Sequence, residues 1–449
     1  MTVDIHTMVS RKSLAKVNDK TAVIGVIGLG YVGLPLAAAS ARVGFKTIGF
    51  DVDESKIPKL KAGESYIDAV SSEELTRLVQ GGVFNATSDL TGLGDCDVII
   101  ICVPTPLTAQ REPDLSYVVK TTQQIATTLK AGQTVVLEST TWPGTTVNVM
   151  KPILEAQGYT SGSDIFVGFS PEREDPGNAH HSTVTIPKVV SGDGAAAGEI
   201  VAAFYSQIVD AVVPVSTPDT AEAVKITENI FRAVNIALVN ELKVVYDAMG
   251  IDVWEVVNAA KTKPFGYMPF YPGPGLGGHC IPIDPFYLTW RAREFDITTR
   301  FIELAGEVNR AMPSYVITRL SEALDQTHGK SLSRSKILLV GLAYKKNVSD
   351  IRESPTFKIM ELLDKRGVHI DYHDPHVDMI PPTREHAEYT GKQSVPLTTE
   401  TLSGYDAVMI VTDHDALDYE KIVQHGTLIV DTRNAIASRG ITSDKVIKA

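Results

Sequence analysis

The first part of the chain contains a strand, a glycine-rich turn, a helix, a second strand and an acid, in that order. Ala22–Ile27 is a short apolar run that ends in Gly28-Leu29-Gly30-Tyr31-Val32-Gly33, and Leu34–Val43 has the small residues of a closely packed helix. Lys46–Phe50 is a second apolar run, which ends at Asp51. This order is typical of the first β-α-β unit of a doubly wound α/β domain.

The glycines and the acid of this unit have separate predicted roles in binding a dinucleotide. Gly28 permits the tight turn, Gly30 admits the pyrophosphate, and Gly33 lets helix and strand pack closely. The helix N-terminus, where Tyr31 and Val32 lie, offers N–H donors and the positive end of a dipole. Asp51 would accept hydrogen bonds from the adenosine ribose. Because a carboxylate there repels a 2′-phosphate, the expected cofactor is NAD rather than NADP.

Three further strands are predicted at Val98–Val103, Thr134–Leu137 and Ile165–Phe169, and polar residues follow each of them. Ligands of a doubly wound sheet bind outside the carboxyl ends of the strands. We therefore expect Thr105, Thr140 and Glu172 to meet cofactor or substrate. The alternative, that the Pro, Thr and Ser residues there only form turns, stays open for each one taken singly.

A long helix is predicted next, from Thr217-Pro218-Asp219 to about Met249-Gly250. At ~1.5 Å per residue it would be about 45 Å long, which suits a helix that links domains or packs on a symmetry mate. Lys225 and Asn229 are four residues apart and share a face. They could direct an ammonium and an amide at one substrate oxygen, or they could be a solvated charge beside a helical Asn.

The glycine-rich stretch Pro272–Asp284 ends with Cys280 and, four residues later, Asp284. A thiol in such a loop, just before a helix, is placed like a nucleophile, and the helix N-terminus and a nearby Lys225 would stabilise its thiolate. Asp284-Pro285 could be the N-cap and first residue of a helix over Phe286–Glu294, which does not exclude a second role. Cys96 and Cys102, beside or within an apolar strand, are interpreted as buried hydrophobes.

The last third of the chain predicts a second Rossmann-like unit. Ser335–Val340 runs into Gly341 without a complete GxGxxG, and strands follow at Val368–Tyr372, Ala407–Val411 and Leu428–Val430. Basic residues at or near these strand ends are candidates for gripping a diphosphate, although each could be a surface charge: Lys345, Lys346, Arg352 and Arg433.

Composition limits the classes of function. A chain of 449 residues predicts two to three domains. We place a loose or weakly docked extension at residues 1–20, an NAD-binding domain at 21–216, a helical domain with the Cys loop at 217–328 and a second Rossmann-like domain at 329–449. The net charge of −12 disfavours nucleic acid or an anionic membrane as partner. No secretory signal, membrane span or metal-binding Cys/His spacing is expected. Three cysteines without regular spacing suggest a reducing cytoplasm.

With these residues assembled, the chain resembles the UDP-glucose/GDP-mannose dehydrogenase family from about Val23 to Asn434. The resemblance rests on the GLGYVG turn, Lys225-x-x-x-Asn229, GGHC-x-x-x-D, and the run from Lys345 to Ser354. Ser170–Asn178 and Lys263–Gly275 are similar to the branch that acts on UDP-N-acetylglucosamine. Arg173 departs from the UDP-glucose branch, which more often has Phe there. The implied fold is α/β, with two Rossmann-like doubly wound domains joined by a long central helix and an all-helical middle domain.

The resemblance implies two successive oxidations of a sugar C6 alcohol to the carboxylate, with two NAD reduced. Cys280 would form a thiohemiacetal and then a thioester, and Glu172 or Asp284 would assist its hydrolysis. Thr140 and Asp284 would hold a water for the first proton transfer, and Lys225 and Asn229 would stabilise the oxyanion.

The resemblance also assigns binding residues. Lys56 would join Asp51 near the adenosine, and Arg352 would reach the cofactor pyrophosphate. Lys345 and Arg433 would contact the UDP or sugar side. The loop Phe270–Gly275, with Tyr271, Gly273 and Gly275, would bind the sugar. A homodimer or larger oligomer, paired through the central helix, is expected.

Other readings differ in substrate or class. UDP-glucose, UDP-N-acetylmannosamine and UDP-N-acetylgalactosamine are alternative substrates. A two-electron dehydrogenase of the 6-phosphogluconate or 3-hydroxyacid type would need neither the cysteine nor the second Rossmann-like domain. A non-catalytic nucleotide-sugar sensor would have no need of a thiol in that loop.

Overall fold

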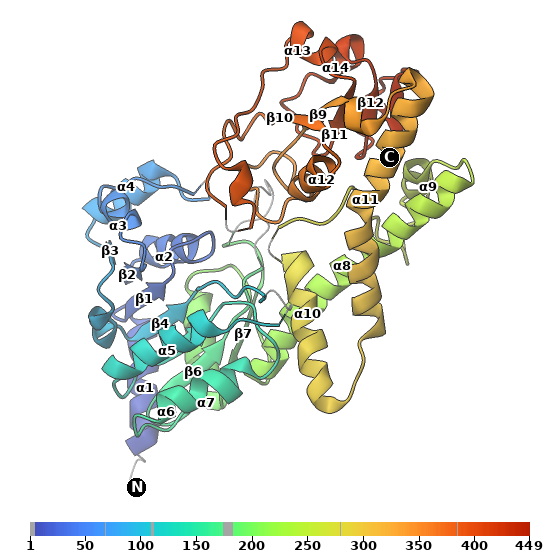
Figure 1. Cartoon of the computed structure of the whole chain (residues 1–449). Helices are drawn as coiled ribbons and strands as arrows, with labels where there is room; N and C mark the ends of the chain where they lie inside the picture. Colours follow the sequence, from blue (N-terminus) through green and yellow to red (C-terminus); the bar gives the residue numbers. More distant parts are fainter. Residues whose placement is uncertain (1–4, 68, 109–111, 174–182, 279, 384) are drawn as a thin grey trace. The chain divides into compact units, whose positions relative to one another are not determined.

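A computed structural model describes residues 5–67, 69–108, 112–173, 183–278, 280–383 and 385–449 (Figure 1). The chain forms two compact units. The N-terminal unit comprises Met1–Glu228 and Phe286–Ile297, and the C-terminal unit comprises Asn229–Pro285 and Thr298–Ala449. The domain boundaries expected from the sequence, at 20, 216 and 328, stay a prediction.

The N-terminal unit contains an eight-stranded sheet in the order β3-β2-β1-β4-β5-β6-β7-β8. Neighbouring strands are parallel except β6 and β7. The order reverses between β1 and β4, which is the switch point where a doubly wound sheet binds its ligand. The strands are β1 (Val23–Ile27), β2 (Lys46–Phe50), β3 (Phe84–Thr87), β4 (Val98–Ile101), β5 (Thr134–Leu137), β6 (Phe166–Phe169), β7 (Lys188–Gly192) and β8 (Val212–Pro214).

Helices pack on this sheet through alternate strand residues. Ile24 and Val26 of β1 lie in one core with buried residues of the helices that follow the strands, such as Leu34 and Val201. Successive strand side chains point to opposite faces, so continuous apolar strands are buried on both sides. The helices are α1 (Ile5–Asn18), α2 (Gly33–Arg42), α3 (Lys56–Lys61), α4 (Ser72–Gln80), α5 (Ser116–Thr128), α6 (Lys151–Glu155) and α7 (Ala195–Ser206).

The N-terminal extension, expected to be loose or weakly docked, contains a helix that docks on the N-terminal unit. Residues 5–18 form α1, and Val17 is only 1% exposed in the core shared with α7. Ser13 donates to the carbonyl of Gly132 at 2.7 Å, and Lys16 pairs with Asp97 at 2.5 Å. Val9 and Leu14 also pack against this core, so apolar contacts and two polar anchors hold the helix on the domain.

The C-terminal unit contains a five-stranded parallel sheet in the order β10-β9-β11-β12-β13. Ile337 and Leu339 of β9 pack in a core that includes Leu320 and Phe357, whereas Leu338 and Val340 pack with Leu402 and Ile422 on the other face. The elements are β9 (Lys336–Val340), α12 (Pro355–Asp364), β10 (His369–His373), α13 (Thr399–Ser403), β11 (Ala407–Ile410), α14 (Tyr419–His425), β12 (Ile429–Asp431) and β13 (Val446–Lys448).

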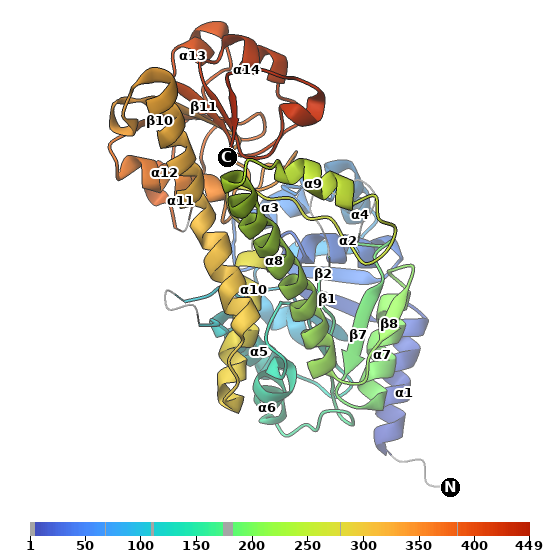
Figure 2. The ribbon, with the colours of Figure 1, turned by 90° about the vertical axis from the view of Figure 1, so that its right-hand side faces the viewer.

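Four helices form the middle of the chain, as the sequence predicts. They are α8 (Pro218–Ala248), α9 (Val253–Ala260), α10 (Cys280–Ala292) and α11 (Arg300–His328). Figures 1 and 2 show α8 and α11 side by side, and Asn309 of α11 donates to the carbonyl of Ala233 in α8 at 3.1 Å. None of the helices in the described ranges is both long and apolar enough to cross a membrane.

Helix α10 starts earlier than the sequence suggests. It begins at Cys280, so Asp284 and Pro285 lie within it and are not its N-cap and first residue. The prediction was wrong because Pro285 was taken as a start signal, whereas the helix accepts the loss of one backbone donor there. Cys280 itself is therefore in the first turn of the helix.

Candidate functional site

The glycine turn after β1 has the geometry expected of a pyrophosphate cradle. Gly28 has φ +90°, and a Cβ there would lie 2.5 Å from the carbonyl oxygen of Cys102. A Cβ on Gly33 would collide with the carbonyl of Gly28. A Cβ on Gly30 would meet no described atom within 4 Å, so the space beside it is open to a ligand. Val32 precedes α2, and no described side chain caps that helix, so the positive end of its dipole is available to an anion.

Asp51 is held at the end of β2 in the position that the sequence predicts for ribose recognition. It is 6% exposed, and one carboxylate oxygen accepts from the backbone N–H of Leu29 at 2.9 Å and from Lys56 Nζ at 2.8 Å. The sequence analysis missed Tyr66, whose hydroxyl donates to the carbonyl of Leu29 at 2.6 Å. Burial, followed by the charges of Asp51 and Asp53, raises the pKa of Tyr66, so it remains a neutral donor.

Thr105 follows β4 and is fixed through its backbone. Its carbonyl accepts a short hydrogen bond from the hydroxyl of Tyr287, a fully buried residue of α10. The ring of Tyr287 lies 6.4 Å from that of Trp142, which in turn lies 4.7 Å from Trp290. Aromatic residues of α10 thus hold the loops after β4 and β5. Sequence reasoning missed Tyr287 because a lone Tyr in a helix carries no such signal.

Thr140 is half-buried at the end of β5, in a turn that a carboxylate of α8 anchors. Glu222 accepts from the N–H groups of Gly144 at 2.6 Å and Thr146 at 2.9 Å, and from the Thr146 hydroxyl at 2.7 Å. Burial raises the pKa of Glu222 to about 7 despite these hydrogen bonds. Next to Thr140, the buried hydroxyl of Thr141 has no hydrogen-bond partner within the described part of the chain.

Glu172 and Lys225 form one buried ion pair. Lys225 Nζ lies 3.3 Å from a carboxylate oxygen of Glu172, and their side chains are 6% and 14% exposed. The solvated alternative for Lys225 is therefore excluded. Arg173, the next residue after Glu172, pairs with Glu228 at 2.6 Å. Residues 174–178, the rest of that motif, lie outside the described residues.

A second buried charge network lies at the same strand ends, and the sequence analysis did not find it. Glu138 follows β5 and is 1% exposed; it accepts from Lys188 Nζ at 3.0 Å and from the Tyr205 hydroxyl. Burial, followed by the charge of Glu138, raises the pKa of Tyr205 well above its ordinary value. The available signal was Lys188, which precedes two Val residues in an apolar strand. Because a buried lysine nearly always has a partner, a buried acid could have been expected near it.

In the C-terminal unit, Asn229 and Asp284 are joined directly. Asn229 Nδ2 donates to a carboxylate oxygen of Asp284 at 2.6 Å, and the two residues are 3% and 4% exposed. Asp284 lies one turn after Cys280 in α10. Cys280 is half-buried in the first helical turn, where the helix dipole favours a thiolate. His279, which precedes it, lies outside the described residues.

The glycine loop before Cys280 is held by a buried amide pair and an arginine. The N–H of Gly273 donates to Asn240 Oδ1 at 3.0 Å, and Asn240 donates to Asn309 at 2.9 Å. The Arg433 guanidinium lies so close over Gly273 that a Cβ would collide with it. The structure therefore brings together Gly273 and Arg433, two of the predicted substrate-binding residues.

Four other residues of this unit were predicted to bind substrate or cofactor, and the structure gives the surroundings of each: Tyr271, Gly275, Lys345 and Arg352. Gly275 has φ +147° and packs against Pro355 and Pro313. The Tyr271 hydroxyl donates to Asn258 at 2.8 Å. Arg352 pairs with Asp350, and its carbonyl accepts from the N–H of Gly278 at 3.0 Å. Lys345 is half-buried in the loop after β9.

The N-terminal unit has residues that suit both halves of a dinucleotide. The open space at Gly30 and the uncapped start of α2 suit a phosphate, and the carboxylate of Asp51 suits a ribose. Cys96, by contrast, is not a reactive thiol: burial and then the charges of Asp95 and Asp97 raise its pKa to about 12.

Three family models match the chain in order. They are the NAD binding domain (residues 22–209), the central domain (219–311) and the UDP binding domain (338–438) of the UDP-glucose/GDP-mannose dehydrogenase family. UDP-N-acetyl-D-glucosamine 6-dehydrogenase of Pseudomonas aeruginosa is 35% identical over 393 residues, which cover 87% of this chain and 90% of that protein.

Relatives with other substrates are almost as similar. NDP-N-acetyl-D-galactosaminuronic acid dehydrogenase of Ralstonia nicotianae is 32% identical, covering 94% of this chain and 97% of its own. The solved structure of the UDP-D-ManNAc dehydrogenase from Pyrococcus horikoshii superposes with a TM-score of 0.85 at 31% identity, covering 95% of this chain and 98% of that one. The expected fold is confirmed.

Proposed function

The chain belongs to the UDP-glucose/GDP-mannose dehydrogenase family, and we propose that this NAD-dependent UDP-sugar dehydrogenase oxidises UDP-N-acetylglucosamine at C6 to the uronate. The observation that carries the proposal is Cys280 in the first turn of α10, one turn before an Asp284 that is bound to Asn229. The 35% identity to a UDP-N-acetyl-D-glucosamine 6-dehydrogenase favours this sugar. The alternatives remain UDP-N-acetylmannosamine, UDP-N-acetylgalactosamine and UDP-glucose.

Bound NAD supplies the hydride acceptor for each of the two oxidations, so one sugar consumes two NAD and one water and releases three protons. For the first oxidation, Asp284 takes the C6 hydroxyl proton through a water that Thr140 also holds. The hydrogen bond from Asn229 orients the Asp284 carboxylate, as a base at this position requires.

Cys280 then holds the half-oxidised carbon. Its sulfur adds to the aldehyde, and the carbonyl oxygen becomes the thiohemiacetal oxygen. The donors for that oxygen are Lys225 and Asn229, whose buried side chains need little reorganisation. The second oxidation gives the thioester, and water, with Glu172 or Asp284 as base, displaces the sulfur and releases the acid.

The UDP-sugar is assigned to the C-terminal unit. Arg433, pressed onto Gly273, suits a diphosphate or a sugar oxygen, and Lys345 would add a cation from the loop after β9. Residues Tyr271, Gly273 and Gly275 would bind the sugar itself, and Arg352 would serve the cofactor pyrophosphate. Reaction in the cytoplasm stays a prediction.

A product assay tests the proposal. Each of the four UDP-sugars is incubated with the full chain and NAD, and NADH and uronate are measured. We expect about two NADH per sugar consumed, with the fastest turnover on UDP-N-acetylglucosamine. One NADH per sugar would contradict a four-electron oxidation. Faster turnover of another UDP-sugar would show that this other sugar is the substrate.

Cys280→Ala separates the thiol step from cofactor binding. We expect no uronate from this variant and an unchanged dissociation constant for NAD, since no predicted NAD contact is removed. Cys96→Ala is the matched control, because that thiol is buried in the turn before β4 and its loss should leave turnover unaltered. Uronate formation by Cys280→Ala would remove the covalent step.

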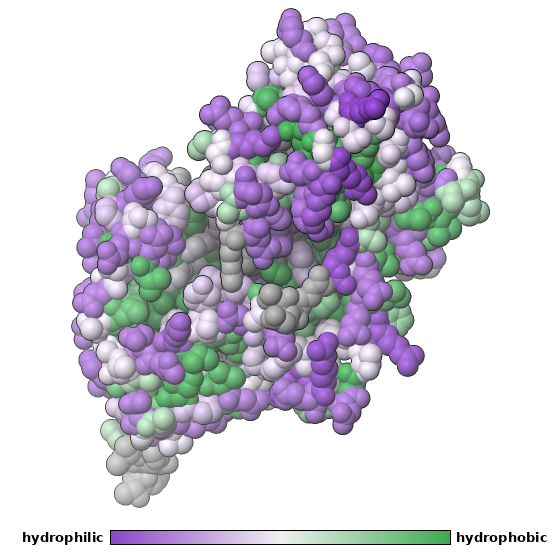
Figure 3. Space-filling view, viewed as in Figure 1, coloured by the Kyte–Doolittle hydropathy of each residue, from purple (hydrophilic) through white to green (hydrophobic). Residues whose placement is uncertain are grey.

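A homodimer through α8 is also proposed. The helix exposes the apolar side chains of Phe231, Leu238 and Val245 on one face, and Met249 directly after it is also exposed. In Figure 3 hydrophobic residues gather over α9, which follows the end of α8. An apolar stripe of this kind on a long helix is typical of an interface with another chain.

A further inference from the structure

The two Rossmann-like units place a carboxylate at the same point of their topology. In the N-terminal unit, Gly28 donates to the carbonyl of Phe50, and Leu29 donates to Asp51. In the C-terminal unit, Gly341 donates to the carbonyl of His373, and Leu342 donates to Asp374 at 2.6 Å. Gly28 and Gly341 have nearly the same φ, +90° and +95°. Asp374 is therefore the counterpart of Asp51, the predicted ribose ligand.

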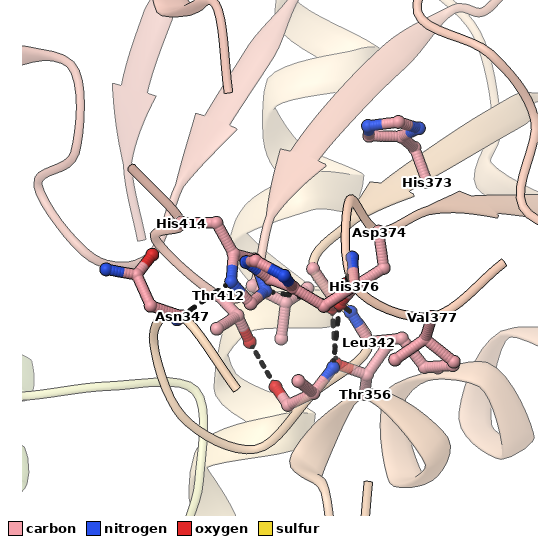
Figure 4. Close-up of polar contacts among 12 residues, drawn as sticks. Leu342, Asn347, Thr356, His373, Asp374, His376, Val377, Thr412 and His414 are labelled. Atoms are coloured by element: carbon pink, nitrogen blue, oxygen red, sulfur yellow. Dashed lines mark hydrogen bonds and ion pairs between the residues drawn. The ribbon is translucent and has the colours of Figure 1, made fainter. Parts of the chain in front are cut away.

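The surroundings of the two carboxylates differ. Asp51 is covered by Lys56, whose side chain is 29% exposed and can move aside. Asp374 is sealed by His414, and both side chains are 0% exposed (Figure 4). One oxygen of Asp374 accepts from Leu342, Ala343 at 2.9 Å and His414 Nε2 at 3.1 Å, and the other accepts from the N–H of His376 at 2.8 Å. This carboxylate has no access for a ribose hydroxyl.

The second ring nitrogen of His414 holds the far end of the same loop. His414 Nδ1 accepts from the backbone N–H of Asn347 at 3.0 Å, which assigns the ring proton to Nε2, on the side of Asp374. Asn347 has φ +61°, a conformation that needs support from its neighbours. Thr412, two residues before His414, donates to the carbonyl of Ala343 at 2.6 Å. The loop Leu342–Asn347 is thus fixed at both ends.

This loop touches the segment that leads to the thiol. Tyr344 packs on the glycines before Cys280: a Cβ on Gly277 would lie 2.5 Å from Tyr344 Cβ, and one on Gly278 would lie 2.9 Å from its ring. Lys345 follows in the loop. All of these residues belong to the C-terminal unit. The position of the loop therefore determines both where Lys345 is presented and where Tyr344 supports the glycines.

We propose that Asp374 and His414 are positioning residues for the UDP-sugar: the carboxylate that occupies in the C-terminal unit the place of Asp51 forms, with His414, a clamp that shapes the loop Leu342–Asn347. The clamp acts on nucleotide-sugar binding and not on NAD. This inference rests on the proposed function, in which this unit takes the UDP-sugar.

Two substitutions of His414 separate its two hydrogen bonds. In His414→Asn the amide oxygen lies near the place of Nδ1 and can still accept from Asn347, whereas the bond to Asp374 is lost. In His414→Gln the amide nitrogen can still donate to Asp374, whereas Asn347 loses its acceptor. The bond from the Asn347 N–H supports that residue at φ +61°, whereas the Asp374 carboxylate keeps three other donors without His414. The Gln variant should therefore be the weaker binder.

The measurements are made on the full chain. UDP is titrated calorimetrically, and KM for the UDP-sugar, KM for NAD, kcat and the melting temperature are recorded. We expect about a tenfold weaker UDP affinity and a matching rise in KM for the UDP-sugar in His414→Gln. His414→Asn should stay within about threefold of the unaltered protein, and KM for NAD should not change in either. His369→Ala, which removes a histidine side chain that is 61% exposed at the start of β10, is the control.

Equal losses in the Asn and Gln variants, or a parallel change in KM for NAD, would show that His414 only stabilises the fold and would overturn the proposal. Wild-type UDP affinity in His414→Gln would do the same. Absence of UDP binding in the unaltered protein overturns this inference as well. UDP binding without uronate formation overturns the proposed function alone, and the comparison of the variants then still decides the role of the clamp.

Discussion

At the scale of single residues, burial decides which ionisable groups can do chemistry. Cys96 is enclosed under the sheet, and its raised pKa keeps it a neutral thiol. Cys280 lies in the first turn of a helix, where the dipole favours the thiolate form. The same side chain is thus packing material at one position and a candidate nucleophile at the other. The sequence also separates the two, because a glycine-rich loop and an apolar strand are different contexts, and the role of Cys280 as a nucleophile stays a prediction.

The pair of Glu138 and Lys188 leads to a prediction about stability. Lys188→Met leaves the Glu138 carboxylate buried without its cation, which should lower the free energy of unfolding by about 3–5 kcal/mol. The double variant Glu138→Gln, Lys188→Met removes both charges and should recover most of that loss. Urea unfolding followed by tryptophan fluorescence measures both.

The control for this prediction is an exposed pair in the same unit. Lys130 lies 3.5 Å from Asp95, and both side chains are more than half exposed. Lys130→Met should change the free energy of unfolding by less than about 1 kcal/mol. If Lys188→Met costs no more than Lys130→Met, the buried network does not hold the strand ends.

At the scale of elements, the parts that a local pattern specifies were predicted, and the parts that depend on distant contacts were not. The apolar runs gave β2 and β5 with the bounds that the structure has. The docking of α1, the start of α10 at Cys280 and the clamp on Asp374 depend on partners far away in the sequence. A window of a few residues does not contain that information. The sequence did show one relevant feature: Asp374 follows β10 as Asp51 follows β2.

Glu222 of α8 holds the turn before α6, and its contribution to the stability of the fold should depend on pH. It holds this turn through Gly144 and Thr146. Its pKa is raised to about 7, above the ordinary 4.5, so the folded state keeps a proton that the unfolded state releases between these values. Its ionisation therefore costs nothing below about pH 4.5 and destabilises the fold by about 3 kcal/mol above pH 7.

Glu222→Gln removes this titration. We expect the melting temperature of the unaltered protein to fall relative to that of Glu222→Gln as the pH is raised from about 5 to about 8. Glu241→Gln, on the exposed side of α8, should run parallel to the unaltered protein at every pH. A constant difference between Glu222→Gln and the unaltered protein would show that the carboxylate is already ionised in the folded state at the lower pH.

At the scale of the whole molecule, α8 has an unusual distribution of side chains. The polar residues Glu222, Lys225, Asn229 and Asn240 are buried together with apolar residues of the helix, whereas Phe231, Leu238 and Val245 are exposed. A helix on the surface of a monomer would show the reverse. The arrangement suits a helix that serves the site with one face and binds a second copy of the chain with the other.

Substitution on the apolar face tests the dimer. Light scattering after size-exclusion chromatography should give twice the chain mass of 48.6 kDa for the unaltered protein. Leu238→Glu, which places a charge in the middle of the stripe, should shift the mass toward that of one chain, whereas Glu241→Gln should not. A monomer in the unaltered protein, or a stable dimer in Leu238→Glu, would contradict an interface at this face.

The length of α8 has a consequence for how such a chain can vary. Each residue turns the helix by about 100°, so an insertion or deletion between Asn229 and Asn240 would swing the loop anchor at Gly273 out of phase with the thiol helix. Point changes on the outer side leave that phase intact. Descendants of this protein can therefore change the partner-facing side of α8 by substitution, whereas a change of its length by one residue would disrupt the site.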